Sequence, residues 1–278
     1  MYVPPAFAEE RVEVLHEFMR HNSFANVVTG GAEGPVASHV PVLLLSERGK
    51  YGTLQMHLAR QNGQWRELAG GTRALVMFQG PHAYVSPRWY RTAMTVPTWN
   101  YVAVHAYGVA RVLDDEGLAG HLRLLTAAYE AAPGGWSTER IPEEVMRKMR
   151  GGIVGFEIEV ERLEGKWKLG QNRVEADVRG AIRGLRESGE AEAVRVAEMM
   201  SDALGGEGRG VMPRGIVEGG FHMGGAIRVR SGGWVHPPLV DARRAGVPDP
   251  PGREGEHEVR PYGRVSGQEC ATRACCEL

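Results

Sequence analysis

The sequence of 278 residues contains only three cysteines, and all of them lie near its end, at Cys270, Cys275 and Cys276. Because no cysteine precedes residue 270, no disulfide framework can support the fold. No window has the roughly 18 uninterrupted apolar residues that a membrane-spanning helix needs. The first residues, MYVPPAFAEERVEV, lack the basic flank and the apolar core of a secretory signal. We therefore expect a cytoplasmic protein.

The chain also lacks a net charge of either sign, since 33 lysines and arginines oppose 34 aspartates and glutamates. A protein that binds DNA through its phosphates usually has a basic face. The basic stretch from Arg183 to Arg195 includes Glu187, Glu190 and Glu192, so we interpret it as a solvated helix face. No convincing helix-turn-helix pattern is present. We expect any DNA contact to be weak or indirect.

Several catalytic motifs are missing as well. No GxGxxG follows a predicted strand, and the sequence has no GxxxxGK[ST] phosphate loop. The histidines before residue 110 do not have the HExxH spacing, so no metal site is predicted. A GxSxG turn is absent, which argues against a serine hydrolase. No residue can be assigned as a catalytic acid, base or nucleophile.

Residues 201–278 differ in composition from the preceding chain. They hold 16 glycines and 7 prolines in 78 positions, a share typical of segments that do not fold. We therefore divide the chain into a folded domain at residues 1–200 and a disordered tail at residues 201–278. The tail is either a natural extension or the product of a shifted reading frame, and the intact mass of the native protein would separate these two origins.

Residues 1–200 alternate short apolar runs with helical patterns. Helical spacing predicts helices near 12–22, 118–131, 141–149 and 174–200, with a short helix or loop at 61–68. Strands are predicted at 24–29, 36–45, 52–57, 74–79, 100–113 and 152–163. The run 36–45 is almost entirely apolar, which predicts a strand buried on both faces. Short turns between about six strands indicate a closed or nearly closed antiparallel barrel with flanking helices, a mainly β fold of the α+β class.

Five segments place polar and aromatic residues where a barrel should be apolar: 38–39, 56–62 with Trp65, 80–84, 99–101 with His105, and 165–173. Arginine, glutamine and asparagine side chains at a strand end suit a phosphate monoester. Tryptophan and tyrosine rings offer flat surfaces to an aromatic ligand. Each histidine or ring taken alone is more often a core residue, so the residues by themselves leave an anion site and a simple core both open.

At these segments the chain resembles the PaiB-type FMN-binding negative transcriptional regulators. The resemblance covers roughly residues 1–200 and rests on MYVPPAF at 1–7, NSFANVVT at 22–29, ASHVPVLLL at 37–45, GTLQMHLARQNGQW at 52–65, FQGPHAYVSPRWY at 78–90, VPTWNYVAVHAYG at 96–108 and IVGFEIEVERLEGKWKLGQNR at 153–173. One departure is Gly63, where the family usually has proline. Because glycine frees the φ angle that proline fixes, we expect a softer loop and weaker FMN binding.

The resemblance implies a homodimeric FMN-binding split β-barrel, related to the pyridoxamine-phosphate oxidases, with FMN at the dimer interface. It implies that one strand contacts the isoalloxazine ring, and the matching residues are Ser38, His39 and Val40. It implies that the loop after the next strand binds the phosphate, and the matching residues are Met56, His57, Arg60, Gln61 and Asn62. It implies that a third segment reaches the partner's flavin, and the matching residues are Trp167, Lys168, Gln171, Asn172 and Arg173. His39 and His57 are also candidates for tuning the flavin ring.

Two functions remain open at this point. The family implies a flavin-binding repressor that acts on sporulation and degradative-enzyme genes. The alternative is a flavin-dependent oxidoreductase or reductase acting on a small molecule, in which the flavin carries the redox chemistry and the protein positions it. Bleaching of the flavin bands by NAD(P)H would favour the enzyme.

Overall fold

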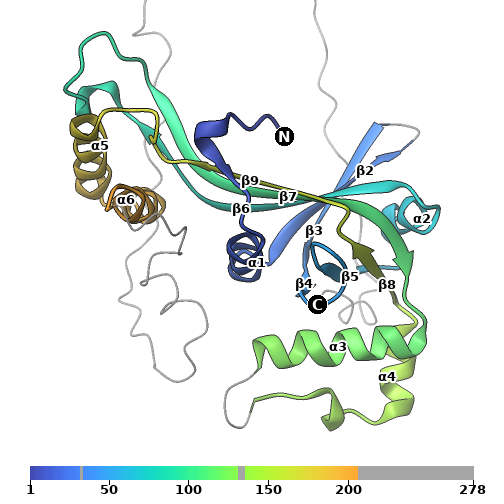
Figure 1. Ribbon diagram of the computed structural model, residues 1–278. Helices are drawn as coiled ribbons and strands as arrows, with labels where there is room; N and C mark the ends of the chain where they lie inside the picture. Colours follow the sequence, from blue (N-terminus) through green and yellow to red (C-terminus); the bar gives the residue numbers. More distant parts are fainter. Residues whose placement is uncertain (32–33, 131–134, 206–278) are drawn as a thin grey trace, which may run out of the picture. The chain divides into compact units, whose positions relative to one another are not determined.

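The computed structural model describes residues 1–31, 34–130 and 135–205 (Figure 1). The tail predicted at 201–278 falls outside the described residues from position 206 onward, while residues 201–204 complete the last helix and Gly205 caps it. In chain order the elements are η1 (Pro5–Phe7), β1 (Ala8–Glu9), α1 (Val12–His21), β2 (Phe24–Gly31), β3 (Gly34–Pro41), β4 (Leu43–Leu45), β5 (Thr53–Ala59), α2 (Gln64–Ala69), β6 (Arg73–Val85), η2 (Pro87–Trp89), β7 (Thr98–Val112), α3 (Asp115–Tyr129), η3 (Thr138–Arg140), α4 (Glu143–Arg150), β8 (Ile153–Glu159), β9 (Arg162–Lys168), α5 (Glu175–Ser188) and α6 (Ala191–Leu204).

The strands form one antiparallel sheet with the path β3-β2-β6-β7-β8-β5-β4. β6 pairs along one edge of the long strand β7, while β9 and β8 share its other edge, β9 near the start of β7 and β8 near its end. β9 also pairs with β1. The ends of the path, β3 and β4, are consecutive in the chain, but no ladder joins them among the described residues. The sheet is therefore not closed, so of the two expected forms, closed or nearly closed, the structure contradicts the fully closed barrel.

Two predicted strands have different limits in the structure. The strand predicted to stop at Gly80-Pro81 continues to Val85, because a register shift between Gln79 and His82 absorbs these residues as a bulge. The strand predicted at 152–163 is two strands, β8 and β9, joined at Val160-Glu161. That connection lacks the glycine or proline that usually marks a turn. Residues 165–168 consequently lie on a strand and not in a loop.

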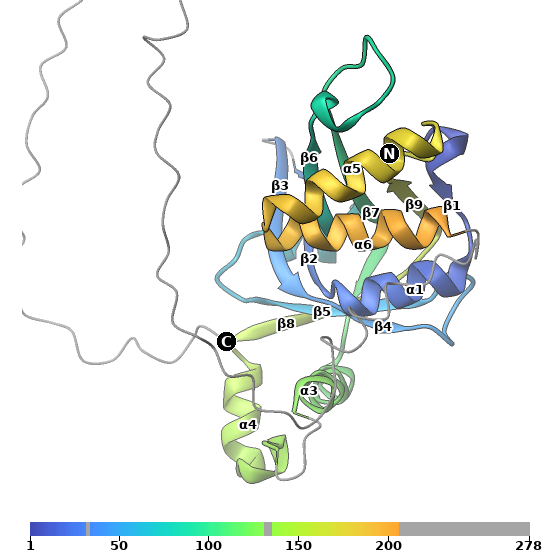
Figure 2. The same cartoon turned by 90° about the vertical axis from the view of Figure 1, so that its left-hand side faces the viewer.

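The inner face of the sheet carries the core, whose largest fully buried side chains include Phe18, Phe78 and Phe156. Figure 2 shows α1, α5 and α6 lying across this face, and α5 and α6 pack on each other and on β6. Gly80 lets α1 approach the sheet, because a Cβ there would lie 2.7 Å from the ring of Phe18. The helices leave the outer face of β2, β6 and β7 uncovered.

β3 contradicts the prediction of a strand buried on both faces. Only Val40 of its eight residues is buried, because β3 ends the sheet path and pairs with β2 alone. The neighbouring ring of Phe24 is 68% exposed. Apolar composition alone could not distinguish an interior strand from an apolar edge that stays uncovered in a single chain.

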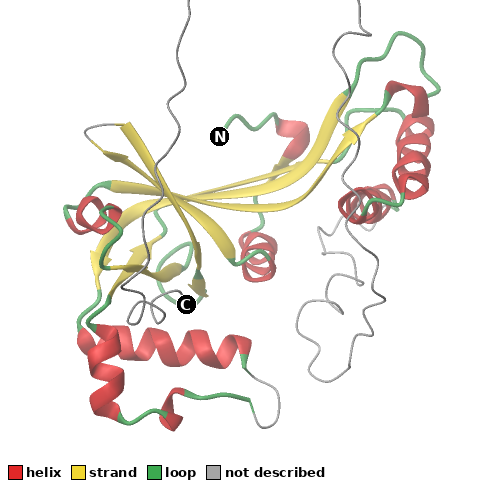
Figure 3. Ribbon diagram, turned by 180° about the vertical axis from the view of Figure 1, so that it is seen from behind, coloured by secondary structure: helices red, strands yellow, loops and turns green. Residues whose placement is uncertain are grey.

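α3 and α4 lie together beyond the β8 end of the sheet, away from α5 and α6 (Figure 3). α3 is attached lightly, since Leu118 and His121 are its only buried residues. The buried guanidinium of Arg150 in α4 joins the two helices by binding Asp115 at 3.0 Å and Glu143 at 2.8 Å. Within the described ranges, no helix combines the length and the apolar character needed to cross a membrane.

Candidate functional site

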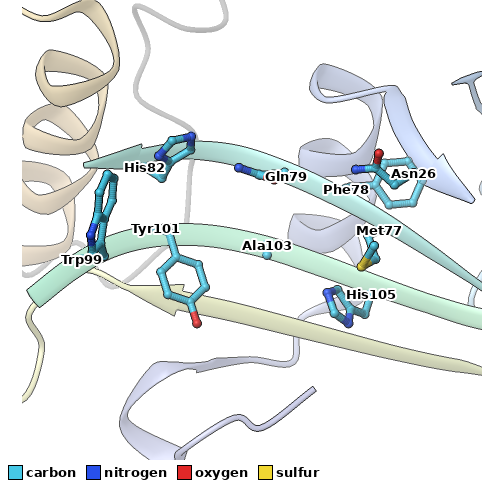
Figure 4. A pocket seen from close by; sticks show the side chains of 9 residues that line it. All are labelled: Asn26, Met77, Phe78, Gln79, His82, Trp99, Tyr101, Ala103 and His105. Atoms are coloured by element: carbon cyan, nitrogen blue, oxygen red, sulfur yellow. The ribbon is translucent and has the colours of Figure 1, made fainter. Parts of the chain in front are cut away.

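The outer face of the sheet contains an open groove of about 350 Å³ (Figure 4). Strand pairing creates it, because Asn26 is opposite Met77 and Met77 is opposite His105, so that their side chains lie on one face. The lining residues are Asn26, Met77, Phe78, Gln79, His82, Trp99, Tyr101, Ala103 and His105. Aromatic and apolar walls with a few amide and imidazole groups suit a flat heteroaromatic ring.

The sequence analysis singled out only some of the residues that line the groove. The segments 80–84 and 99–105 drew attention through their histidines and aromatic rings. Asn26 and Met77 were missed, because each is an ordinary strand residue until the register of three strands is known. Burial lowers the pKa of His105 and the nearby terminal ammonium group adds to this effect, so its ring is neutral at pH 7.

Positive charge gathers beside the groove at the start of β7. Lys168 donates from Nζ to Oγ1 of Thr98 at 2.6 Å and to the carbonyl of Trp99 at 2.7 Å. The Arg173 guanidinium lies over the ring of Tyr90, 4.8 Å from its centre. Burial, together with the charges of Lys166 and Arg173, lowers the pKa of Lys168. In the described part of the chain neither Lys168 nor Arg173 forms a salt bridge, so an anionic ligand would be stabilised here.

A second group of donors surrounds the end of β5. Asn62 donates from Nδ2 to Oγ of Ser38 at 2.8 Å, which joins the loop after β5 to β3. Arg60 donates from its guanidinium to the carbonyl of Gly151 at 2.8 Å and to that of Ile153 at 3.1 Å, while Gln61 is exposed. A guanidinium, two amides and a hydroxyl at one strand end form a donor set for phosphate.

His57 lies on β5 just before this loop and faces α3. Its Nδ1 is 3.0 Å from Nε2 of His121, and the two rings meet edge to face at 5.2 Å. Burial lowers the pKa of both imidazoles. For His121 the charge of His57 adds to burial, and its pKa falls to about 4. Both rings are therefore neutral at pH 7.

The remaining predicted residues are dispersed. Val40, Met56 and Trp167 point into the core with exposed fractions of 9%, 0% and 8%, so their side chains offer little surface to a ligand. The ring of Trp167 packs on Phe18 at 5.2 Å. Alternation along β9 explains this, because Lys168 faces outward and Trp167 therefore faces inward.

Three further predicted residues lie on the surface. Gln171 closes the turn after β9, since it accepts from the N–H of Leu169 at 2.8 Å and donates to the carbonyl of Trp167 at 2.6 Å. Asn172 is exposed beside it. His39 is exposed and lies on the side of β3 that continues the groove face, stacked on Phe24 with ring centres 6.4 Å apart. Ser38 points the other way, toward Asn62.

The two groups of donors lie toward different ends of β7, because β9 pairs near its start and β8 near its end. Near the start of β7, Tyr101 pairs with Lys168. At the end of β7, Val112 pairs with Phe156 of β8, and the preceding residue of β8, Gly155, pairs with His57. Between Tyr101 and Val112 the strand advances by about 35 Å along its path. Within one chain the two groups are therefore offset along β7.

Comparison with known proteins identifies relatives of this domain. Residues 1–162 match the family model described as "Putative FMN-binding domain". A protein from Bacillus subtilis, "Protease synthase and sporulation protein PAI 2", is 38% identical over 207 residues, which cover 73% of this chain and 98% of that protein. An uncharacterised protein from Aspergillus fumigatus is 27% identical over 254 residues, covering 73% of this chain and 97% of its own. A solved FAD and heme binding protein from Mycobacterium smegmatis has a TM-score of 0.45 and 19% identity, covering 57% of this chain and 71% of that one.

Proposed function

The chain belongs to this FMN-binding domain family, and on that premise we propose that it holds FMN between two copies of itself and acts as a PaiB-like negative regulator of gene expression. The separation of the two donor groups along β7 carries the proposal of a shared site. The resemblance assigns both groups to one flavin, and a second copy would bring the β9 end of its own sheet to the loop after β5 of the first.

Within this site the loop after β5 receives the phosphate. Arg60 supplies charge, and Asn62, fixed through Ser38, supplies an amide donor. Lys168 and Arg173 of the second copy approach from the other side, where both cations meet the anionic ligand. Bound FMN would supply redox chemistry through its isoalloxazine ring, while the protein binds and orients it.

The uncovered outer face supports the proposal of a homodimer. Trp99 is 51% exposed, Phe24 is 68% exposed and Tyr84 is 48% exposed, and all three lie on strands of that face. Large apolar patches of this kind on soluble proteins usually mark an interface or a ligand site. A second copy that covers this face would bury the groove, its aromatic rings and the edge of β3 together.

The regulatory part of the proposal draws on the Bacillus subtilis relative, whose name refers to protease synthesis and sporulation. The near-zero net charge favours action through a partner or a redox signal over direct DNA binding. We expect that deleting the gene raises transcripts of extracellular protease or sporulation genes, and that the wild-type gene restores them. Unchanged transcript levels in the deletion strain would refute the regulatory role.

The cofactor itself is tested by absorption spectroscopy and by titration of the flavin-free protein with FMN. We expect two visible flavin bands, a dissociation constant near or below micromolar, about −8 kcal/mol, and a dimer by light scattering. Arg60→Gln should weaken FMN binding, whereas the same change at the exposed Arg123 of α3 should not. Absence of flavin binding in the wild-type protein would contradict the proposal.

A further inference from the structure

The contact between His57 and His121 joins the proposed phosphate loop to a helix that the family resemblance does not implicate. His121 is 1% exposed, and its second ring nitrogen, Nδ1, is buried without a hydrogen-bond partner among the described residues. Its Nε2 meets Nδ1 of His57 at 3.0 Å. Both imidazoles are neutral at pH 7, because burial lowers the pKa of each. One ring therefore donates and the other accepts.

Two arrangements of the protons satisfy this hydrogen bond, and they differ in what they leave buried. If His57 donates, His121 carries its proton on Nδ1 and an N–H donor is buried unpaired. If His121 donates from Nε2, only the lone pair of its Nδ1 is left unpaired. Orphaned buried N–H groups are rarer in proteins than under-satisfied acceptors. The second arrangement is therefore favoured.

This arrangement decides what His57 presents to solvent. When Nδ1 of His57 accepts from His121, the proton of His57 must reside on Nε2. His57 is only partly buried, and within the described residues its Nε2 has no hydrogen-bond partner and is not a buried unsatisfied atom. His57 thus offers an N–H donor three residues before Arg60, on the strand that leads into the proposed phosphate loop.

We propose that His121 is a positioning residue for the FMN site: it holds His57 in the Nε2–H form, so that His57 donates a hydrogen bond to the phosphate of the cofactor. The identity of the ligand in this inference rests on the proposed function. The arrangement of the protons on His57 and His121 does not depend on it. The buried Nδ1 of His121 has no hydrogen-bond partner, which lowers the stability of the fold. A role in orienting the donor of His57 explains why a histidine stands at this position.

The small number of buried residues in α3 agrees with this role of His121. Of the fifteen residues in α3 only Leu118 and His121 are buried, so His121 is one of the two side chains that dock this helix on the rest of the domain. Docking of α3 alone would require only an apolar side chain at position 121, and not an imidazole ring. The hydrogen bond to His57 is the one polar interaction that His121 makes in the described part of the chain.

The proton arrangement is tested directly by nitrogen-15 NMR of the imidazole rings in the flavin-free wild-type protein. At pH 7 we expect both His57 and His121 to show a protonated Nε2 and an unprotonated Nδ1. A protonated Nδ1 on His57 would overturn the proposal. Because this measurement requires no flavin, it stays decisive even if the protein does not bind FMN.

The proposed hydrogen bond from His57 to the phosphate is tested by comparing the binding of FMN with that of riboflavin, which lacks the phosphate. His121→Leu should weaken FMN binding about ten-fold or more, the loss expected for a hydrogen bond to a charged group, and leave riboflavin binding unchanged. His121→Gln, whose amide can still donate to His57, should restore most of the FMN affinity. An equal loss for both ligands, or a glutamine variant as weak as the leucine variant, would contradict the positioning role.

Discussion

The side-chain amide of Gln64 donates a hydrogen bond to the carbonyl of Val27, 2.9 Å away. The same nitrogen lies 3.0 Å from the carbonyl of Val36, so a single buried side chain at the start of α2 connects β2 and β3. Gln64 is 2% exposed. The helix that follows the proposed phosphate loop is thereby fixed to the strand that carries Ser38.

Replacing Gln64 by leucine should destabilise the protein by about 2 kcal/mol, because two strand carbonyls lose a buried donor. Urea denaturation of the flavin-free protein measures this change. The matched control is Glu13→Leu on the exposed side of α1, which should alter stability by less than about 0.5 kcal/mol. An unchanged midpoint for the Gln64 variant would show that Gln64 does not hold β2 and β3 together.

Gly184 should not tolerate alanine, since a Cβ there would overlap the ring of Trp89. The loop between β6 and β7 rests on α5 at this point. We expect Gly184→Ala to cost about 1–3 kcal/mol, despite the better helix propensity of alanine. Gly120→Ala in α3, where the nearest atom is the tip of Arg123 at 3.8 Å, should instead stabilise by up to about 1 kcal/mol. Thermal unfolding of both variants separates the two effects.

Stability should fall as the pH drops from about 6.5 toward about 4, because of His121. Its pKa is about 4 when folded and near 6.5 when unfolded. In this window the unfolded chain binds a proton that the folded chain excludes, so acid favours unfolding. The shift corresponds to a loss on the order of 3 kcal/mol.

Asp115 at the start of α3 acts in the same direction, because its hydrogen bond to Arg150 lowers its pKa and this contribution is also lost in acid. Measuring urea stability between pH 7 and pH 4 for the wild-type protein and for His121→Leu checks the prediction. The variant should lose less stability on acidification, and parallel pH profiles would exclude His121 as the source.

The groove face is expected to form the dimer interface. Ala103 lies in the middle of the groove (Figure 4), where a long charged side chain would be buried against a second copy without a partner. Ala103→Arg should shift the protein to a monomer in light scattering and remove FMN binding. Ala127→Arg, the same change at an exposed position of α3, is the control. A dimer that persists in the Ala103 variant would place the interface elsewhere.

A shared site should show complementation between two defective chains. Arg60→Gln and Lys168→Gln should each weaken both sites of a homodimer. A mixed dimer of the two variants contains one site with both changes and one with neither, so it should recover one tight FMN site. Co-expression with two purification tags isolates the mixed dimer for titration. If Arg60 and Lys168 served the same site in one chain, the mixed dimer would stay weak.

Local pattern predicted most elements of the fold. The helical spacing of Val12, Leu15 and Met19 correctly indicated α1, and the β-branched run after Phe24 correctly indicated β2. The predictions failed where the outcome depended on distant residues. The bulge after Gln79 needs β7 as a partner, and the exposure of β3 depends on its place at the end of the sheet path.

Local motifs, such as the one from His57 to Trp65, were enough to identify the family, the FMN-binding domain and the segments that hold the candidate contacts. The direction in which each of these side chains points depends on the folded chain. Strand alternation turns Trp167 into the core and Lys168 outward. Register brings Asn26, Met77 and His105 to one face, and packing of α3 sets His121 against His57. These contacts join residues up to about eighty positions apart, and only the folded chain brings such residues together.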